Sequence, residues 1–382
     1  MNFYRQRLER VRAAMREWKA DLMFINYGAD LTYVSGLVSP RYYNILKHAG
    51  DWITGLVFSL DRDPVLLLQK SFALNIETQT WIRDIRILPD NENPDTFLSK
   101  VLAEFQPAGK TIAVSKMLWG QTVLSLQAAA TSARFITATN TMMDKVRAVK
   151  DEDELQVMQR AAEITDAAMG ATFKVLKAGM TERDVAVEVD YQIRRHGGDG
   201  HSFYPGIICV GNGSDTARHI MTRNTDMVLA PGTTVAFDFG VRYHGYCSDY
   251  GRSAFIGEPR ADALAAYCSI TRASQAVWEI MVDGKSTPAQ IADFVRNLVT
   301  ADGFGEWYWY MALGHGIGLE VHEDPWMRPG SNAPVQAGMC FTIEPKVWKP
   351  GIFYVRCEDV VVVGKDRGTS LTKFHYEPNV IG

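Results

Sequence analysis

Residues 233–257, "TTVAFDFGVRYHGYCSDYGRSAFIG", read as two strands joined by a turn near "RYHG". Asp238 lies in the first predicted strand and Asp249 in the second, both among apolar neighbours. A carboxylate buried in an apolar strand is costly unless it is paired or bound to a metal ion. One such aspartate most often faces solvent, whereas two on one hairpin favour a shared buried role.

Three further segments add polar groups of the same kind. "ALGHGIGLEVHEDP", residues 312–325, carries His315 and His322 around three glycines. "GMCFTIEPKVW", residues 338–348, ends an apolar strand with Glu344, and "FYVRCEDVVVV", residues 353–363, places Glu358 inside another. Arg356 precedes Glu358 by two positions, so the two side chains share a face and can pair.

The four carboxylates and one histidine predict a metal site. Several like charges cannot all ionise in a buried, low-dielectric site unless cations lie among them. Two divalent ions resolve that repulsion. Oxygen-rich ligation with one imidazole suits manganese, cobalt, iron or zinc in a hydrolytic two-metal site.

The chain of 382 residues is long enough for two domains. We place the boundary within residues 143–151, where a charged cluster leads into a long helix. Before it, an opening helix is followed by strand patterns in "ADLMFINY", "WITGLVFSL", "PVLLLQ", "IRDIRILP" and "KTIAVS", with a helix near "DTFLSKVLAEF". This alternation indicates a small α/β domain.

Composition excludes several classes of protein. The formal net charge of −4 gives no reason to expect nucleic acid as a partner. The five cysteines form no CxxC pair and lie mostly in apolar runs, which is typical of reduced thiols. The first residues show no apolar signal core, and no apolar stretch of about 18 residues predicts a membrane span. We therefore expect a soluble cytoplasmic protein.

The second half of the chain contains a weak internal repeat. Segments beginning at Thr181 and Thr287 both open with a threonine N-cap and a polar residue three positions later, which is the capping-box arrangement. Their apolar positions then match at a constant offset of 106, up to Gly197 and Gly303. Two related α/β halves are one interpretation, and chance similarity of two amphipathic helices is the other.

The ordered set "FDFGxxxxGYxSD", "GHGIGLEVHEDP", "TIEP" and "VRxED" closely resembles the pita-bread metallopeptidase family, which includes creatinase, prolidase, aminopeptidase P and methionine aminopeptidase. Members of the Xaa-Pro dipeptidase type are the most similar. The resemblance implies a creatinase-type N-terminal α/β domain over residues 1–146. It implies a pita-bread catalytic domain with a pseudo-twofold internal repeat over residues 147–382.

The resemblance also assigns roles to the ligand set. Asp238 would bind one metal ion through both oxygens, Asp249 and Glu358 would bridge two ions, and His315 and Glu344 would each hold one. Manganese is the first expectation for both ions. A hydroxide bridging them would be the nucleophile, and Glu344 would also shuttle protons.

Other residues would act on the substrate. His322 and His219, which lies nineteen positions before Asp238, would donate hydrogen bonds to the scissile carbonyl or to the tetrahedral intermediate. Arg356 joins them as a catalytic candidate. Family relatives pair as homodimers, in which the N-terminal domain of one subunit reaches towards the catalytic pocket of the other. Candidate substrate-binding residues are Tyr204 and, in the loop "VSPRYYNILKHAGDW" of residues 38–52, Arg41 and Trp52; the alternative is an ordinary surface loop.

Some features depart from the proline-peptidase pattern. Met311 stands four residues before His315, where prolidases and aminopeptidases P usually carry another histidine. An enzyme of the same fold acting on a small non-peptide compound, similar to ectoine hydrolase or dimethylsulfoniopropionate lyase, is therefore an alternative to an Xaa-Pro dipeptidase or aminopeptidase. A silent binding module of this fold is disfavoured, because such modules lose ligands and all five are present here.

Overall fold

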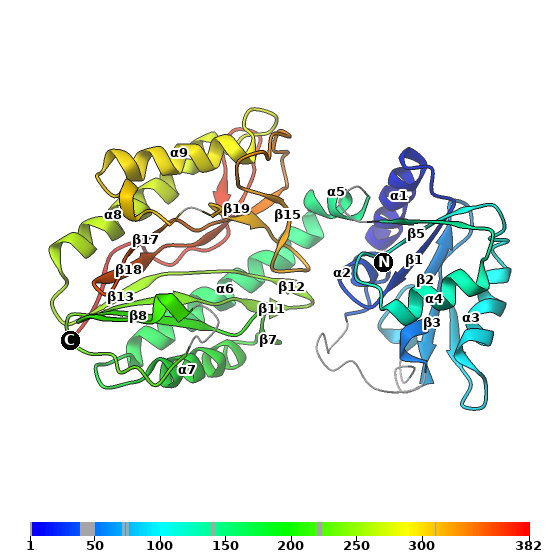
Figure 1. Ribbon diagram of the computed structural model, residues 1–382, viewed down its shortest axis with the longest axis horizontal. Coiled ribbons are helices and arrows are strands. Elements are labelled where there is room, and N and C mark those ends of the chain that lie inside the picture. The colour runs from blue at the N-terminus through cyan, green and yellow to red at the C-terminus, as the bar shows by residue number, and fades with distance from the viewer. Residues whose placement is uncertain are drawn as a thin grey trace. The chain divides into compact units, whose positions relative to one another are not determined.

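The computed structural model describes residues 2–38, 50–70, 73, 76–138, 142–219, 224–309 and 311–382. It divides into two compact units, residues 1–147 and 148–382. Within the described ranges, no helix is both long and apolar enough to cross a membrane. Both units mix helices with strands (Figure 1).

The first unit is built on one six-stranded sheet with the order β4-β3-β2-β1-β5-β6. Strands β1, β2 and β3 pair antiparallel, and the other neighbours pair parallel. Its strands are β1 (Leu22–Asn26), β2 (Gly55–Ser59), β3 (Val65–Gln69), β4 (Asp84–Leu88), β5 (Thr111–Val114) and β6 (Arg134–Thr137). Its helices are α1 (Asn2–Glu17), α2 (Ala29–Ser35), α3 (Pro94–Ala103), α4 (Gly120–Ala129) and α5 (Met143–Ala148).

The five predicted strands of this unit are present, and one of them is shorter than predicted. The stretch that begins at Trp52 enters its strand only at Gly55, because Asp51–Ile53 forms a short 3₁₀ turn. Strand β6 and helices α2 and α4 were not predicted. The α4 sequence "GQTVLSLQAA" buries few of its side chains and has little contrast between its two faces, so periodicity gives a weak signal there.

The second unit contains two five-stranded sheets, ordered β21-β13-β10-β8-β9 and β15-β14-β16-β19-β20, with a small sheet β12-β11-β7 and the hairpin β17-β18. The first half contributes β7 (Gly200–His201), β8 (Gly206–Gly211), β9 (Ser214–Asp215), β10 (Thr234–Asp238), β11 (Val241–Tyr243), β12 (Tyr246–Cys247) and β13 (Ser253–Ile256). The second half contributes β14 (His315–Gly316), β15 (Glu323–Trp326), β16 (Cys340–Ile343), β17 (Lys346–Lys349), β18 (Phe353–Arg356), β19 (Asp359–Val362), β20 (Thr369–Ser370) and β21 (Asn379–Ile381).

Each large sheet carries its own pair of helices (Figure 1). Helices α6 (Glu152–Val175) and α7 (Glu182–Arg195) pack on β8, β10 and β13, whereas α8 (Ala261–Ala276) and α9 (Pro288–Ala301) pack on β16 and the β17-β18 hairpin. The helices of the predicted repeat, α7 and α9, both begin with the expected capping box. Both are followed by a glycine in the left-handed region, Gly197 at φ 96° and Gly303 at φ 90°.

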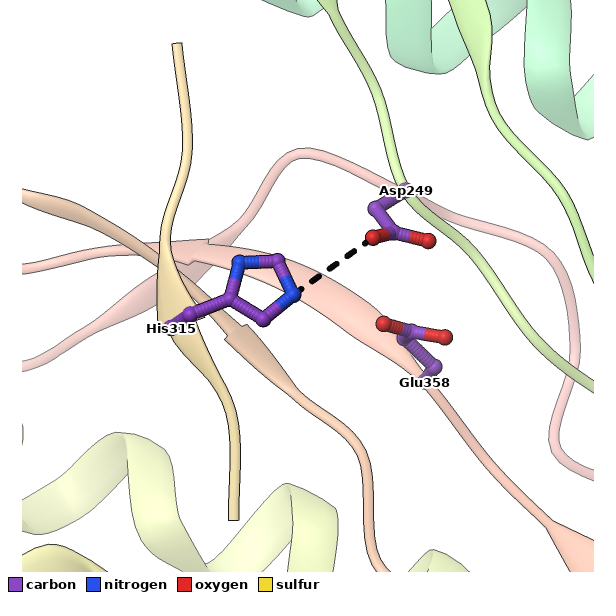
Figure 2. Close-up of side chains that lie close together, drawn as sticks. All are labelled: Asp249, His315 and Glu358. Atoms are coloured by element: carbon purple, nitrogen blue, oxygen red, sulfur yellow. Dashed lines mark ion pairs between the residues drawn. The ribbon is translucent and has the colours of Figure 1, made fainter. Parts of the chain in front are cut away.

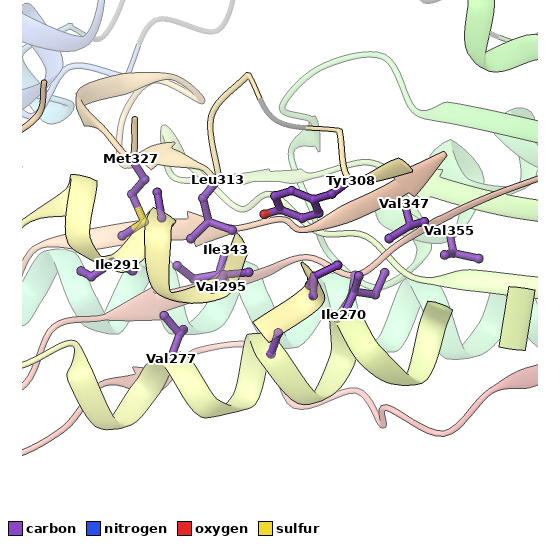
Figure 3. Close-up of a cluster of buried hydrophobic side chains, with 14 of the residues drawn as sticks. Ile270, Val277, Ile291, Val295, Tyr308, Leu313, Met327, Ile343, Val347 and Val355 are labelled. Carbon is purple, nitrogen blue, oxygen red and sulfur yellow. The ribbon is translucent and has the colours of Figure 1, made fainter. Parts of the chain in front are cut away.

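The core under α8 and α9 fixes the strands that carry two of the candidate ligands. Ile270 of α8 and Ile291 and Val295 of α9 are fully buried against Ile343 of β16 and Val355 of β18 (Figure 3). Burying each such side chain contributes about 1.5–3 kcal/mol. Because His315 begins β14 and Glu344 directly follows β16, this packing sets the position of both side chains.

Two sequence predictions about strands need correction. Asp249 does not lie within a strand but between β12 and β13, and Glu358 lies between β18 and β19 rather than inside one continuous strand. Glu358 and Gly251 instead form an isolated antiparallel bridge, in which the Glu358 amide donates to the Gly251 carbonyl at 2.8 Å. The strands stop where the backbone links the two halves of the unit, and apolar content alone does not reveal such a break.

Candidate metal centre

The five predicted ligand side chains come from both halves of the second unit. Asp238 ends β10 and Asp249 follows β12, while His315, Glu344 and Glu358 come from the second half. Four of them are buried, with relative exposures between 1% for Glu358 and 7% for Asp238. Glu344 is half-buried.

Asp249, His315 and Glu358 form a compact group (Figure 2). Each offers one ligand atom, and these atoms all lie within 4.8 Å of one another. The Nε2 atom of His315 is 3.6 Å from Oδ2 of Asp249. This spacing matches a group of side chains that can coordinate one ion, because each metal–ligand bond is about 2.0–2.2 Å long.

The backbone sets the tautomer of His315. Its Nδ1 lies 3.0 Å from the carbonyl oxygen of Gly316 and donates a proton to it. Burial lowers the pKa of His315 to about 4, so the ring is neutral at pH 7. The lone pair of Nε2 therefore faces the carboxylates, which is the form in which imidazole binds a metal ion.

Two carboxylate oxygens of this group lack a hydrogen bond. Oδ1 of Asp249 and Oε1 of Glu358 are buried, and neither has a hydrogen-bond partner among the described residues. Burial, followed by the charge of Glu358, raises the pKa of Asp249 well above its usual range, and burial raises the pKa of Glu358 to about 8. Unsatisfied buried carboxylate oxygens are costly, and a divalent ion bound between them would remove that cost. The residues present therefore fit a metal site.

Arg356 lies among the remaining carboxylates. Its Nη1 is 2.5 Å from Oδ2 of Asp238, and its Nη2 is 3.2 Å from Oε2 of Glu344 and also contacts Glu358. The pairing of Arg356 with Glu358 that their shared face suggests is thus present. Arg356 also pairs with two further carboxylates, which the sequence did not indicate.

Lys346 is the functional candidate that the sequence analysis missed. Its Nζ contacts Oε2 of Glu344, the oxygen that also faces Arg356. Burial alone would raise the pKa of Glu344, but Lys346 and Arg356 lower it. A usable signal was present, because Lys346 is two positions from Glu344 in the otherwise apolar "TIEPKVW".

Two of the glycines beside His315 make room for neighbouring segments of the chain. A Cβ atom at Gly314 would lie 1.9 Å from the carbonyl oxygen of Thr342 on β16, and one at Gly318 would lie 2.9 Å from the side chains of Glu323 and Lys150. Gly314 therefore lets the chain approach β16, and Gly318 makes room for the buried Lys150–Glu323 ion pair. Neither contact is with the ligand group itself.

The other predicted site residues fall into two sets. His322 is exposed, lies beside His315 with ring centroids 4.3 Å apart, and stacks on Trp326. Tyr204 is 81% exposed and its ring lies 4.9 Å from that of His201. His219 ends a short 3₁₀ helix, but its side chain lies outside the described part of the structure, as does Arg41.

Trp52 belongs to the first unit. Its ring packs against the core of that unit, and its Nε1 donates to Oδ1 of Asp95 at 3.4 Å. The side chain therefore has a structural role within its own unit. Its predicted role in substrate binding is untested by these contacts.

Comparison with known proteins assigns the family. Residues 156–365 match the model of metallopeptidase family M24, and residues 7–149 match that of the creatinase/prolidase N-terminal domain. The chain belongs to metallopeptidase family M24. The predicted family, its fold and a hydrolytic enzyme are thereby confirmed.

M24 relatives match over most of this chain. The Xaa-Pro dipeptidase of Lactobacillus delbrueckii subsp. lactis is 30% identical over 89% of this chain and 91% of its own length, and that of Lactobacillus helveticus is 30% identical over 88% and 91%. The crystal structure of a dipeptidase from Pyrococcus horikoshii OT3 matches with a TM-score of 0.86 and 26% identity, covering 98% of this chain and all of that one. M24 enzymes use divalent metal ions, which agrees with the buried Asp249–His315–Glu358 group.

Proposed function

We propose that this chain is a dinuclear metal-dependent peptidase that cleaves the bond between an N-terminal residue and proline, as an Xaa-Pro dipeptidase or aminopeptidase. The observation that carries the proposal is the buried Asp249–His315–Glu358 group with two unsatisfied carboxylate oxygens. The two Lactobacillus relatives, which are named Xaa-Pro dipeptidases, support the choice of substrate.

Each ligand has a proposed place around the metal. Asp249 and Glu358 would each take part in holding both ions, while His315, Glu344 and Asp238 would each hold one of them. Manganese fits best, with cobalt, iron or zinc as alternatives, because the donor set is rich in oxygen and contains one imidazole. Bound ions of this type supply an activated water and polarise the scissile carbonyl.

The remaining steps belong to the side chains. Glu344 accepts a proton from the attacking water and delivers it to the leaving nitrogen. His322, which is exposed beside His315, donates a hydrogen bond to the scissile carbonyl oxygen together with His219. Arg356 holds Asp238 and Glu344 in place through its two terminal nitrogens.

A direct assay tests the substrate. Purified protein supplied with Mn²⁺ should hydrolyse dipeptides of the form Xaa-Pro, and the matched Xaa-Ala dipeptides should be cleaved far more slowly. Equal rates on both series would remove the preference for proline while keeping a dipeptidase. No hydrolysis of either series would overturn the peptidase assignment.

A second candidate reaction rests on Met311. The thioether of Met311 is 78% exposed four residues before His315, where the predicted pattern has a histidine that binds the peptide. Loss of that hydrogen bond favours a small non-peptide substrate, such as a cyclic amidine similar to ectoine. Hydrolysis of such an amidine, with no cleavage of Xaa-Pro dipeptides, would establish this alternative.

We also propose a homodimer in which the loop of residues 38–52 closes the partner's site. The proposal rests on the family resemblance and on the aromatic and basic composition of the loop. In this arrangement Arg41, Trp52 and the exposed Tyr204 contact the substrate. Sedimentation velocity tests the dimer independently of any substrate.

A further inference from the structure

A buried ion pair lies beneath the turn of residues 317–322, which joins β14 to β15 and carries His322. The Nζ atom of Lys150 is 3.1 Å from Oε2 of Glu323, and the two side chains are 2% and 6% exposed. Neither residue is a candidate metal ligand. A buried ion pair often adds little stability compared with apolar side chains of similar size, so the informative feature is what this pair holds in place.

The backbone around Lys150 fixes where its ammonium can reach. The amide of Lys150 donates to the carbonyl of Gly338 at 3.0 Å. The preceding residue, Val149, forms an isolated bridge with Met339. The next residue, Asp151, caps helix α6 with its side chain. Lys150 is therefore held between the start of α6 and the segment that leads into β16.

The carboxylate of Glu323 closes the turn from inside. Its Oε1 accepts a hydrogen bond from the amide of Glu320 at 3.1 Å, while its Oε2 faces Lys150. Gly318 leaves room for this arrangement, because a Cβ atom there would lie 2.9 Å from Oε2. The backbone of Glu323 pairs with Gly316 across β14 and β15. The strand pairing therefore fixes the ends of the turn, and the ion pair fixes the chain between them.

The early and late parts of the turn are attached to different segments. In the early part, the carbonyl of Gly318 accepts from the amide of Cys247 on β12 at 2.7 Å. In the late part, Glu320 is held through Glu323 by Lys150. An unpaired buried carboxylate is costly, so without Lys150 the Glu323 side chain should turn towards solvent and release Glu320.

The position of His322 depends on the late part of the turn. Its ring is exposed, stacks on Trp326 with an angle of 17° between the planes, and has its centroid 4.3 Å from that of His315. Trp326 is itself the cross-strand partner of His315. The three rings form one group only while the backbone of the turn keeps His322 beside the two strands.

We propose that Lys150 is a positioning residue for His322. Through Glu323, its ammonium holds the turn in the conformation that keeps the His322 ring beside His315. The proposal rests on the proposed peptidase function, in which His322 donates a hydrogen bond to the scissile carbonyl. Lys150 pairs with Glu323 rather than with a candidate ligand, so its loss should leave bound metal in place.

The kinetic test is a double-mutant cycle in full-length protein supplied with Mn²⁺, with an Xaa-Pro dipeptide as substrate. H322Q should lower kcat by at least about tenfold, because the hydrogen bond to the scissile carbonyl is lost. K150M should lower kcat by about tenfold with unchanged metal content, since a small misplacement of a catalytic group is enough. K150M/H322Q should be no slower than H322Q within about threefold, whereas independent roles predict that the two losses multiply.

The second measurement is spectroscopic and requires neither metal nor substrate. In metal-free protein labelled with ¹³C-histidine, H322Q removes one ring resonance and thereby assigns it to His322. K150M should shift that resonance, because the ring leaves its stacked position on Trp326. The resonances of His201 and His375, which lie in other segments, should stay unchanged and serve as the internal control.

The variant K150M/E323M separates positioning from stability. It removes both buried charges, so its melting temperature should return towards that of the wild type. The turn still lacks the carboxylate that accepts from the Glu320 amide, so kcat should stay low. If K150M does not fold, as judged by circular dichroism, K150M/E323M takes its place in the cycle and in the spectra.

A folded K150M with the kcat of the wild type would overturn the proposal, as would losses that multiply in K150M/H322Q or an unshifted His322 resonance. Recovery of kcat together with the melting temperature in K150M/E323M would overturn it too, because Lys150 would then only stabilise the fold. Absence of Xaa-Pro hydrolysis by the wild type would instead refute the proposed function, and the His322 resonance would still test the position of the ring. The two failures are therefore distinguishable.

Discussion

The second unit contains two neighbouring clusters of buried charged side chains. Glu358 belongs to one cluster, and Asp359, the next residue in the chain, belongs to the other. Asp359 accepts from Nη2 of the fully buried Arg252 at 2.9 Å, from the Thr372 hydroxyl at 2.6 Å and from the Tyr376 hydroxyl at 2.9 Å. Glu358 contacts Arg356 through one oxygen and has no described hydrogen-bond partner for the other.

The difference separates a structural cluster from the candidate metal centre. In the Arg252 cluster, the guanidinium also donates to the carbonyls of Glu358, Phe374 and His375, so it fastens the C-terminal segment to the unit. A fully satisfied polar network gives rigidity. The neighbouring cluster keeps unsatisfied oxygens on Asp249 and Glu358, which is the condition that a bound cation requires.

The largest expected effect follows from replacing the two proposed bridging ligands. Asp249→Ala or Glu358→Ala should lose both ions together and reduce turnover to the level of chelated wild-type protein, because a bridging side chain holds the pair. Metal analysis by plasma mass spectrometry, combined with the dipeptide assay, measures both effects. Retention of one full ion by either variant would show that the residue does not bridge.

Glu344→Gln should lower turnover by more than about 100-fold, the scale of general acid–base catalysis. The amide keeps the shape of the side chain but cannot carry a proton between water and the leaving nitrogen. Circular dichroism should show an intact fold. Turnover close to that of the wild type would remove Glu344 from the proton-transfer role.

Stability measurements should separate the two clusters directly. Asp359→Asn leaves the buried Arg252 without a counter-charge and should cost about 3–5 kcal/mol. Glu358→Gln, compared in chelated protein, removes a carboxylate from an over-crowded site and should not destabilise. Urea unfolding followed by circular dichroism gives both values, and equal destabilisation by the two substitutions would erase the proposed distinction.

The free energy of unfolding of the metal-free protein should depend on pH, because its crowded carboxylates bind protons more readily in the folded state. Burial raises the pKa of Glu358 to about 8 in the folded chain, against about 4.3 when unfolded. Between these values the folded state holds the extra proton, so stability is lost as the pH rises. Below about pH 6.5 the lowered pKa of His315 has the opposite effect on stability. In that range the unfolded chain binds more protons at this histidine than the folded chain does.

Unfolding of chelated protein should therefore become easier from pH 6.5 to 8, by about 2 kcal/mol. Saturating Mn²⁺ should abolish the slope, and Glu358→Gln should reduce it without metal, because the buried Asp249 also binds a proton more readily in the folded chain. Melting curves across this range make the measurement. Constant or rising stability in chelated wild-type protein would contradict the assignment of the raised pKa to Glu358.

The smallest effect is expected in the predicted dimer. Arg41→Ala should raise KM for a dipeptide several-fold and leave bound metal unchanged, because a guanidinium anchor at such a contact affects binding more than chemistry. Trp52→Ala is the less clean variant, since its ring also packs on the core of the first unit. A monomer with full activity, or unchanged KM in both variants, would return the loop to an ordinary surface role.

Much of the candidate metal centre was predictable because acidic residues are rare in apolar segments. Asp238, Asp249, Glu344 and Glu358 stand out in the sequence for that reason, and all four lie in or beside the site. The strand breaks at Asp249 and Glu358 were not predictable, because they depend on a bridge between Gly251 and Glu358, 107 positions apart in the chain.

The contacts of Arg356 and Lys346 could be predicted only in part from neighbouring residues in the sequence. The pairing of Arg356 with Glu358 follows from a spacing of two residues. The contacts of Arg356 with Asp238 and Glu344 depend instead on how β10, β16 and β18 assemble. Lys346 escaped notice because a lysine beside a proline in a strand is most often solvated, and only the assembled hairpin places it on Glu344.

Reconstitution with Mn²⁺ tests the two-metal mechanism. Chelated wild-type protein is titrated with Mn²⁺ while the hydrolysis of an Xaa-Pro dipeptide and the number of bound ions are followed together. Hydrolysis should stay at background without metal and reach its full rate as occupancy approaches two ions per chain. Full activity in protein shown to be metal-free would contradict the two-metal mechanism.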